Sequence, residues 1–231
     1  MKFYINPSNQ PGNLYCKGNT NERDNMRIIA ALTADALRRC GQEVRVGTGM
    51  ESGVSESNAW GADVHVPMHS NAANGKARGA RVFYGTAEDK AKIVWGYLDQ
   101  SVGGQHVAPT KQTNLYEIRN TNAECIYIEA AFHDNPDDCD LLLHQRDQIA
   151  ETTCRGLCGA YGIEYVPPGT AVLDAAKEGK FTMEDAQNWA VAAGLFRGDD
   201  NGKMNWKEPL TRSQAAMLLY RFYKGFIKTL G

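Results

Sequence analysis

The sequence predicts an α/β fold, with a mostly parallel sheet covered by helices on both faces, followed by a small all-α domain. Short apolar runs alternate with segments of helical periodicity through residues 1–165. Residues 166–170 (VPPGT) have the composition of a linker, and only helical patterns follow it in 171–231. Because parallel strands require long crossover connections, the alternation favours βαβ units in the first domain.

Local sequence pattern predicts the strands and helices of the first domain. Residues 2–6 (KFYIN) predict a strand that ends in a Pro-Ser-Asn turn. Apolar residues then recur with a helical period over 21–39, where Thr20 or Asn21 can cap the helix and Gly41 can end it. The same reasoning predicts strands at 43–46, 62–69, 79–84 and 125–130, helices at 55–60 and 90–100, and one long helix or two between 136 and 161.

The second domain is predicted to be a helical hairpin. Its helices are expected at 182–193 and from Thr211 onward, with Gly194 closing the first and a turn at 199–202. A domain of this size lies near the lower limit for independent stability. We therefore expect it to pack on the first domain or on another copy of the chain, as a homo-oligomer.

Composition and charge exclude some classes of partner. The chain has 231 residues, 42% hydrophobic and 23% charged, and a net charge of −2, so nucleic-acid binding is not expected. No segment approaches the roughly 20 apolar residues of a membrane span. The N-terminus, MKFYINPSNQ, is too short and polar for a signal peptide, which predicts synthesis in the cytoplasm and export by another route.

The six cysteines form no Cys-x-x-Cys pair. Cys154 and Cys158 lie four apart on a predicted helix, but no third or fourth ligand has a spacing suitable for zinc. Scattered cysteines without a signal peptide predict free thiols in a reducing compartment.

Two predicted strands end on residues with catalytic potential. The segment 62–72 (ADVHVPMHSNA) ends its strand on His69, and 126–132 (IYIEAAF) ends another on Glu129. Carboxyl ends of parallel strands meet at one edge of a sheet, and a histidine with a carboxylate suits metal-assisted hydrolysis. Strand-end histidines are often structural and carboxylates in apolar runs are usually paired, so spacing alone leaves both interpretations open.

Four segments carry a resemblance to a known family: NPSNQ at 6–10, Glu22 at the start of the first helix, ADVHVPMHSNA at 62–72, and IYIEAAFHDN at 126–135. With them, residues 1–163 resemble the zinc-dependent N-acetylmuramoyl-L-alanine amidases of the Amidase_3 type, found in phage endolysins and bacterial autolysins. The resemblance implies that Glu22 and His69 are zinc ligands and that Glu129 is the catalytic glutamate. It also implies hydrolysis of the peptidoglycan amide bond between N-acetylmuramic acid and L-alanine.

The chain departs from the family after the first strand. The family usually has Gly-His-Gly there, whereas this chain has Ser8-Asn9-Gln10 and no histidine before position 65. The resemblance to phage-type amidases with Pro-Ser-x-Gln makes Gln10 the expected third ligand, with Asn9 as the alternative. An amide oxygen is a weaker zinc donor than imidazole, so we expect weaker zinc retention. A second interpretation is that the site has lost both metal and activity.

Other residues near these segments are candidates for binding substrate. His133 follows Glu129 in a loop and can orient substrate or stabilise the tetrahedral intermediate, or be a loop histidine without a role in the reaction. Arg119 precedes the catalytic strand and, by the resemblance, lies near the cleft, where it can clamp a stem-peptide carboxylate or be an ordinary surface arginine. Asn71 is a substrate-binding candidate that can instead fix its own loop. His65 is expected to be structural and to face the same side of the sheet as His69.

Residues 170–228 resemble one S-layer-homology repeat, through the runs 189–198 and 209–215. The family's Thr-Arg-Ala-Glu-like tetrad is Thr211-Arg212-Ser213-Gln214 here, without the acidic member. Such repeats bind anionic secondary cell-wall polymers, so the resemblance implies a wall-binding role for Thr211 and Arg212.

The leading hypothesis is a zinc-dependent peptidoglycan amidase with a wall-targeting tail, a phage or prophage endolysin that acts at the bacterial cell wall. One alternative is a non-catalytic wall-binding protein on the same scaffold, which the missing histidine favours and Glu129 opposes. A further alternative is a zinc peptidase acting on stem peptides with the same metal ligands.

Overall fold

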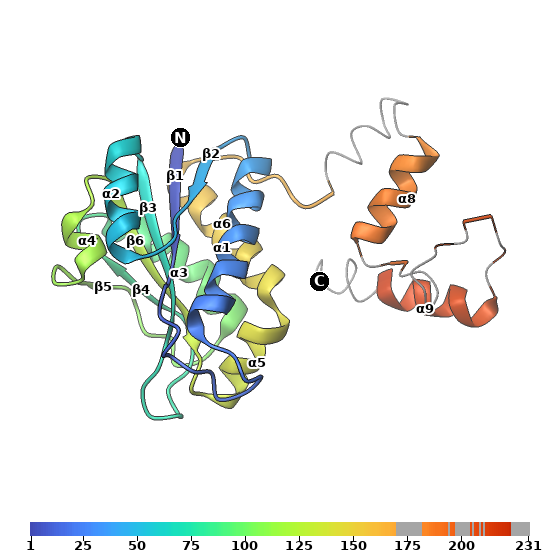
Figure 1. Cartoon of the computed structure of the whole chain (residues 1–231), viewed down its shortest axis with the longest axis horizontal. Coiled ribbons are helices and arrows are strands. Elements are labelled where there is room, and N and C mark those ends of the chain that lie inside the picture. Colours follow the sequence, from blue (N-terminus) through green and yellow to red (C-terminus); the bar gives the residue numbers. More distant parts are fainter. Residues whose placement is uncertain are drawn as a thin grey trace. The chain divides into compact units, whose positions relative to one another are not determined.

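The computed structural model describes residues 1–169, 182–193, 195–196, 204, 206–207, 209 and 211–222. The chain separates into two compact units, Met1–Val166 and Pro167–Gly231 (Figure 1). No helix in the described part of the chain has the length and apolarity that a membrane crossing requires.

The first unit is built on a six-stranded sheet with the order β2-β1-β3-β6-β4-β5. Its strands are β1 (Lys2–Pro7), β2 (Glu43–Val46), β3 (Val64–Asn71), β4 (Arg81–Tyr84), β5 (Thr110–Lys111) and β6 (Glu124–Phe132). Strands β2, β1, β3 and β6 are parallel, β4 is antiparallel to β6, and β5 is parallel to β4. The mostly parallel sheet is therefore confirmed. Strand β4 runs the other way because the short connection 72–80 has no room for a crossover helix.

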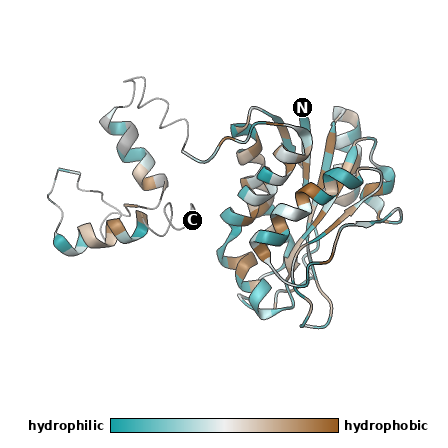
Figure 2. Cartoon of the chain, turned by 180° about the vertical axis from the view of Figure 1, so that it is seen from behind, coloured by the Kyte–Doolittle hydropathy of each residue, from teal (hydrophilic) through white to brown (hydrophobic). Residues whose placement is uncertain are grey.

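Helices cover both faces of the sheet, as predicted. One face carries α1 (Glu22–Arg39), α3 (Glu88–Val102), α5 (Pro136–His144) and α6 (Arg146–Tyr161), and the other carries α2 (Met50–Trp60) and α4 (Tyr116–Asn120). Figure 1 shows α2 and α4 on the opposite side of the strands from α1, α5 and α6. Figure 2 shows apolar stretches along the strands and hydrophilic patches on the helices that enclose them.

Alternation along the strands decides which side chains are available for function. In β3, Val66 and Met68 are fully buried in the core, so His65 and His69 point to the other face of the sheet. Strand β6 alternates in the same way and turns Glu129 towards that face. The thinner layer formed by α2 and α4 therefore covers the side of the sheet that carries the candidate site.

Several element boundaries differ from the prediction. Strands β3 and β6 continue past His69 and Glu129, because their ladder extends to the pair Asn71 and Phe132 after a register shift. The two candidate residues therefore lie inside the carboxyl-terminal parts of their strands and not at the last residue. The long helix predicted after residue 136 is two helices that meet at Gln145. The short elements α4 and β5 were not predicted.

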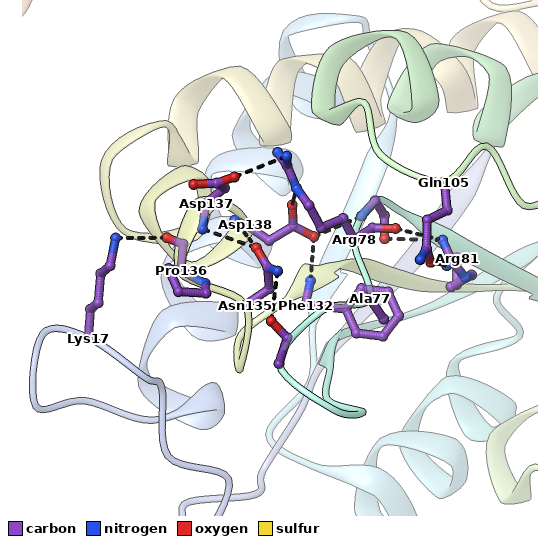
Figure 3. Close-up of polar contacts among 12 residues, drawn as sticks. Lys17, Ala77, Arg78, Arg81, Gln105, Phe132, Asn135, Pro136, Asp137 and Asp138 are labelled. Atoms are coloured by element: carbon purple, nitrogen blue, oxygen red, sulfur yellow. Dashed lines mark hydrogen bonds and ion pairs between the residues drawn. The ribbon is translucent and has the colours of Figure 1, made fainter.

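The buried carboxylate of Asp138 forms hydrogen bonds with the segments that meet at the carboxyl edge of the sheet (Figure 3). Asp138 in the first turn of α5 is fully buried. It accepts hydrogen bonds from the backbone N–H of Gly79 at 2.8 Å and of Phe132 at 3.0 Å, and from Arg78 Nε at 3.2 Å. The carboxylate therefore joins α5, the start of β4 and the end of β6, the strand that carries Glu129.

Replacing Asp138 by alanine is expected to lower the free energy of unfolding by about 3 kcal/mol, because two buried N–H groups lose their acceptor. The matched control is Asp137→Ala, since Asp137 also pairs with Arg78 but its side chain is 68% exposed. Loss of that surface pair should cost less than about 1 kcal/mol. Urea unfolding of both variants measures the difference, and equal effects would contradict the role given to Asp138.

The second unit contains two described helices, α8 (Met183–Ala192) and α9 (Arg212–Phe222). They correspond to the helices expected at 182–193 and from Thr211 onward. Arg221 Nη1 donates to the Leu195 carbonyl at 3.0 Å and joins α9 to the segment after α8. The predicted Gly194 stop, the turn at 199–202 and the end of the linker at Thr170 lie outside the described residues.

Candidate functional site

His69 and Glu129 are neighbours across two central strands. Their Cα atoms are register partners in the parallel pair of β3 and β6, so their side chains leave the same face of the sheet. The ring of Tyr127, two residues before Glu129, stacks on the His69 imidazole with centroids 4.8 Å apart and planes inclined by 16°. This packing holds the imidazole in one orientation at the carboxyl edge.

Glu22 reaches the same place from the start of α1. The side chain of Asn21 caps the helix by accepting from the backbone N–H of Asp24, which starts the helix at Glu22. The buried Glu22 carboxylate lies 2.9 Å from His69 Nδ1 and accepts from the Ser70 N–H at 3.2 Å. Burial raises the pKa of Glu22, but the hydrogen bonds from His69 and Asn13 outweigh it and hold the pKa below its usual value.

A second carboxylate, Glu117 on α4, approaches the other side of the His69 ring. Its Oε1 lies 4.0 Å from His69 Nε2, and its Oε2 lies 3.0 Å from Nε2 of the fully buried His65. Burial disfavours a charged His69, but Glu117 and Glu22 overcome this and raise the pKa of His69 to about 9. Glu117 therefore links His65, which faces the same side as predicted, to the candidate metal ligand.

Glu129 is the carboxylate in this group with an unsatisfied oxygen. Its Oε2 is buried and has no hydrogen-bond partner among the described residues. Burial raises the pKa of Glu129 to about 7, against the opposing effect of nearby His69. A carboxyl group with that pKa exchanges a proton readily near neutral pH, as a general acid–base group requires.

The donor set fits a divalent cation. Three carboxylates, those of Glu22, Glu117 and Glu129, lie near His69, and one further imidazole, that of His65, pairs with Glu117. Three carboxylates therefore face two imidazoles. The buried Glu129 Oε2 is an acceptor without a hydrogen-bond donor among the described residues. Carboxylate oxygens with imidazole nitrogen are among the ligands that zinc uses in proteins. His69 Nδ1 lies 2.9 Å from the other candidate ligand, Glu22, whereas its Nε2 lies 4.0 Å from Glu117 and has no hydrogen-bond partner among the described residues.

The two candidates for the third ligand point in different directions. Gln10 Oε1 accepts from Asn13 Nδ2 at 2.5 Å, and the same Nδ2 donates to Glu22 Oε2 at 2.6 Å. The amide group of Asn13 therefore lies between the Gln10 side chain and the Glu22 carboxylate. The Asn9 side chain instead packs against Gly49, where an added Cβ would lie 2.5 Å from Asn9 Nδ2. This geometry favours Gln10 over Asn9.

His133 belongs to a buried network beside the site. Its ring stacks on Tyr15 with centroids 5.1 Å apart, and its Nδ1 lies 2.9 Å from Ser70 Oγ. Tyr15 also donates to Ser70 Oγ at 3.1 Å, and the Ser70 N–H donates to Glu22. Burial lowers the pKa of His133, so the ring is neutral at pH 7.

The remaining candidates lie at the edge of the site. The Asn71 side chain accepts from the Ala72 N–H at 2.8 Å, so it fixes its own loop. The Arg119 side chain is exposed on α4, and its position two residues after the inward-facing Glu117 places it about 200° around the helix. Neither the Asn71 nor the Arg119 side chain contacts His69 or the three carboxylates around it.

In the second unit, Thr211 acts as a helix cap. Gln214 Oε1 accepts from the Thr211 N–H at 2.8 Å, and the Gln214 N–H donates to Thr211 Oγ1 at 3.2 Å. This reciprocal pair is a capping box, so glutamine fills the capping role of the missing acidic residue. Arg212 begins α9 with its side chain exposed.

Sequence reasoning missed Glu117, Asn13 and Tyr127. Glu117 lies in a single helical turn with no periodic pattern, and Asn13 lies in a loop. One signal was available for Glu117, since a histidine in an apolar strand, such as His65, needs a buried polar partner. The sequence did not identify which of the chain's 27 acidic residues is the partner of His65.

Fold and site together define a hydrolytic enzyme of the α/β class. A model of the N-acetylmuramoyl-L-alanine amidase family (Amidase_3) matches residues 7–159, and the chain belongs to this family. The chain is accordingly a peptidoglycan amidase, which hydrolyses the amide bond between N-acetylmuramic acid and L-alanine.

Solved structures with a similar fold include three enzymes of this kind. The N-acetylmuramoyl-L-alanine amidase AmiC2 of Nostoc punctiforme is 18% identical, with a TM-score of 0.64 over 70% of this chain and 97% of its own. An N-acetylmuramoyl-L-alanine amidase from Clostridium difficile 630 is 22% identical, with a TM-score of 0.63 over 70% and 96%. The catalytic domain of the CD27L endolysin, which targets Clostridia difficile, is 21% identical, with a TM-score of 0.58 over 69% and 97%. Among curated proteins, no significant sequence match is found.

Proposed function

We propose that this amidase is zinc-dependent, that Gln10, Glu22 and His69 hold the metal, and that Glu129 carries the proton. The observation that supports this proposal is the convergence of His69, Glu22 and Glu129 at one edge of the sheet, where Glu129 Oε2 has no hydrogen-bond partner among the described residues. When bound there, zinc supplies Lewis acidity to the scissile carbonyl and to the attacking water.

The protein groups have separate tasks in the reaction. Glu129 accepts a proton as water attacks the lactyl carbonyl of muramic acid and returns it to the amine of L-alanine as that group leaves. Its pKa of about 7 suits both transfers at neutral pH. His133 uses Nδ1 towards Ser70, so its Nε2 is the ring atom available to orient substrate. Arg119 and Asn71 remain proposed substrate contacts at the rim.

We also propose that the chain is an endolysin-type enzyme whose second unit binds an anionic secondary cell-wall polymer, as an S-layer-homology-like repeat in 171–231. The support is the helix start at Arg212, where the Thr211 capping box leaves an exposed guanidinium beside a helix N-terminus. Both features favour an anion. Helix α9 buries none of its described side chains, and Leu219 is 68% exposed, so pairing with a second copy would cover an apolar surface.

Analysis of the products tests the proposed reaction. Purified peptidoglycan is digested with the full chain, before and after treatment with a zinc chelator. The proposal predicts intact stem peptides with free L-alanine amino termini, and loss of activity with the chelator that added zinc reverses. Cleavage inside the stem peptide would show a peptidase. Unchanged peptidoglycan at full zinc occupancy would show a non-catalytic wall-binding protein.

Replacing Gln10 by histidine is expected to tighten zinc binding by about tenfold, because imidazole is a better zinc donor than an amide oxygen. The matched control is Asn9→His, which places the imidazole on the side chain that packs against Gly49. Competition with a chromogenic chelator measures both affinities. Tighter binding in the Asn9 variant alone would make Asn9 the ligand.

Replacing Glu117 by glutamine is expected to weaken zinc binding about 10- to 100-fold, because the site loses a negative charge beside the candidate ligand His69, whose Nε2 lies 4.0 Å from the Glu117 carboxylate. Glutamine can still hydrogen-bond His65, so the fold should survive. Arg119→Ala on the same helix is the control and should leave zinc affinity unchanged. A Glu117→Gln protein with normal zinc affinity would leave Glu117 only a structural role.

A further inference from the structure

Three buried thiols meet between α1 and α6, away from the amidase site. Cys40 is the C-terminal cap of α1, and Cys154 and Cys158 lie one turn apart on α6. The Sγ of Cys154 is 3.9 Å from that of Cys40 and 3.9 Å from that of Cys158, and all three sulfurs lie within 4.8 Å of one another. None of the three side chains is more than 7% exposed.

The cluster is distinct from the catalytic centre. Glu22 opens α1 and Cys40 follows its last residue, so the 18-residue helix separates them by about 27 Å. Glu22 lies at the carboxyl edge of the parallel strands. Cys40 lies at the opposite edge, just before β2 begins at Glu43. The thiols therefore take no part in peptidoglycan hydrolysis.

The spacing of the sulfurs suits a shared cation. A metal about 2.3 Å from each sulfur would space them about 3.8 Å apart in a tetrahedral site and about 4.0 Å apart in a trigonal one. The two separations of 3.9 Å fall between these values. They are also far longer than the roughly 2.05 Å of a disulfide bond.

One backbone donor and one cationic side chain lie beside the cluster. The Val166 N–H donates a hydrogen bond to Cys40 Sγ at 3.3 Å, so the cluster has one backbone donor. Arg39 donates from Nε to the Val166 carbonyl at 2.8 Å while its Nη2 pairs with Glu151. Metal ligation requires thiolates, which a nearby backbone donor and a nearby cation favour.

We propose that Cys40, Cys154 and Cys158 form a structural site for a soft, thiophilic cation of the Zn²⁺ or Cu⁺ class. Three sulfur ligands select such ions over magnesium or calcium, which require oxygen. The ion ties the end of α1 to α6 and, through Cys40, to the segment that leads out of the first unit at Val166. The site is independent of the proposed catalytic metal.

The test uses the full chain carrying His69→Ala, so that the proposed catalytic ligand set is broken. The protein is purified under reducing conditions, its bound metals are identified by elemental analysis, and it is then titrated with Cd²⁺. We expect one retained thiophilic ion per chain and a thiolate-to-metal charge-transfer band that reaches its end point at one equivalent. Zinc or copper in the analysis identifies the natural ion.

Cysteine variants show which thiols give rise to the charge-transfer band. Cys40→Ser and Cys158→Ser should each lose it, whereas Cys16→Ser, which changes an exposed thiol outside the cluster, should keep it. Without the His69 change, Cys40→Ser should retain wall-lysing activity, because the two sites lie at opposite ends of α1. The proposal is overturned by absence of the band, by its persistence in a folded Cys40→Ser protein, or by a protein mass that shows a disulfide among the three.

Discussion

Replacing Glu129 by glutamine is expected to lower the rate of peptidoglycan hydrolysis by about 100-fold to 10,000-fold, the usual contribution of general acid–base catalysis. Glutamine keeps the size of the side chain but cannot carry a proton between the water and the leaving amine. Zinc content should stay at the parent level, because the proposed ligands are Gln10, Glu22 and His69. Release of stem peptides and zinc content are measured on the same preparation.

The control for this variant is Glu124→Gln on the same strand. Glu124 is partly exposed and pairs with Lys90, so its change should leave the rate of hydrolysis unaffected. A Glu129→Gln protein that digests peptidoglycan at the normal rate would refute the proton-carrier role. Loss of zinc in this variant would instead make Glu129 a ligand.

Replacing His69 by alanine should remove zinc and activity together. The variant loses a candidate metal ligand and leaves the buried Glu22 carboxylate without its His69 partner, whereas Glu117 keeps its contact with His65. We expect zinc affinity to fall by at least about 100-fold and hydrolysis to fall with it. Chelator competition and peptide release, followed over a zinc titration, measure the two effects.

The control for His69 is His106→Ala, because His106 is an exposed imidazole that pairs with Asp99 outside the site. That variant should bind zinc and hydrolyse peptidoglycan as the parent does. If His69→Ala kept its zinc but lost activity, His69 would contact substrate and the metal would bind elsewhere. If it kept both, the proposed site would be wrong.

Local sequence pattern was sufficient to predict most of the strands and helices of the first unit. The strand at 43–46 was predicted to the residue, and the helix capped by Asn21 was predicted at 21–39. These features depend on neighbours a few residues apart, which alternation, helical period and capping chemistry describe. The pairing of β4 with β6 was not predicted, because it depends on contacts between strands that lie far apart in the sequence.

The amino-acid sequence by itself determined the α/β class and the family to which the chain belongs, and it pointed to His69 and Glu129 as a functional pair. Only the tertiary structure placed Glu117 against His65 across 52 positions of sequence, and Cys40 against Cys154 across 114. It also placed Gln10 beside Asn13 and Asn9 against Gly49, which supports Gln10 as the proposed third ligand. The physical reason is that periodicity assigns a side chain to a face, whereas its partner on that face is set by how distant elements pack.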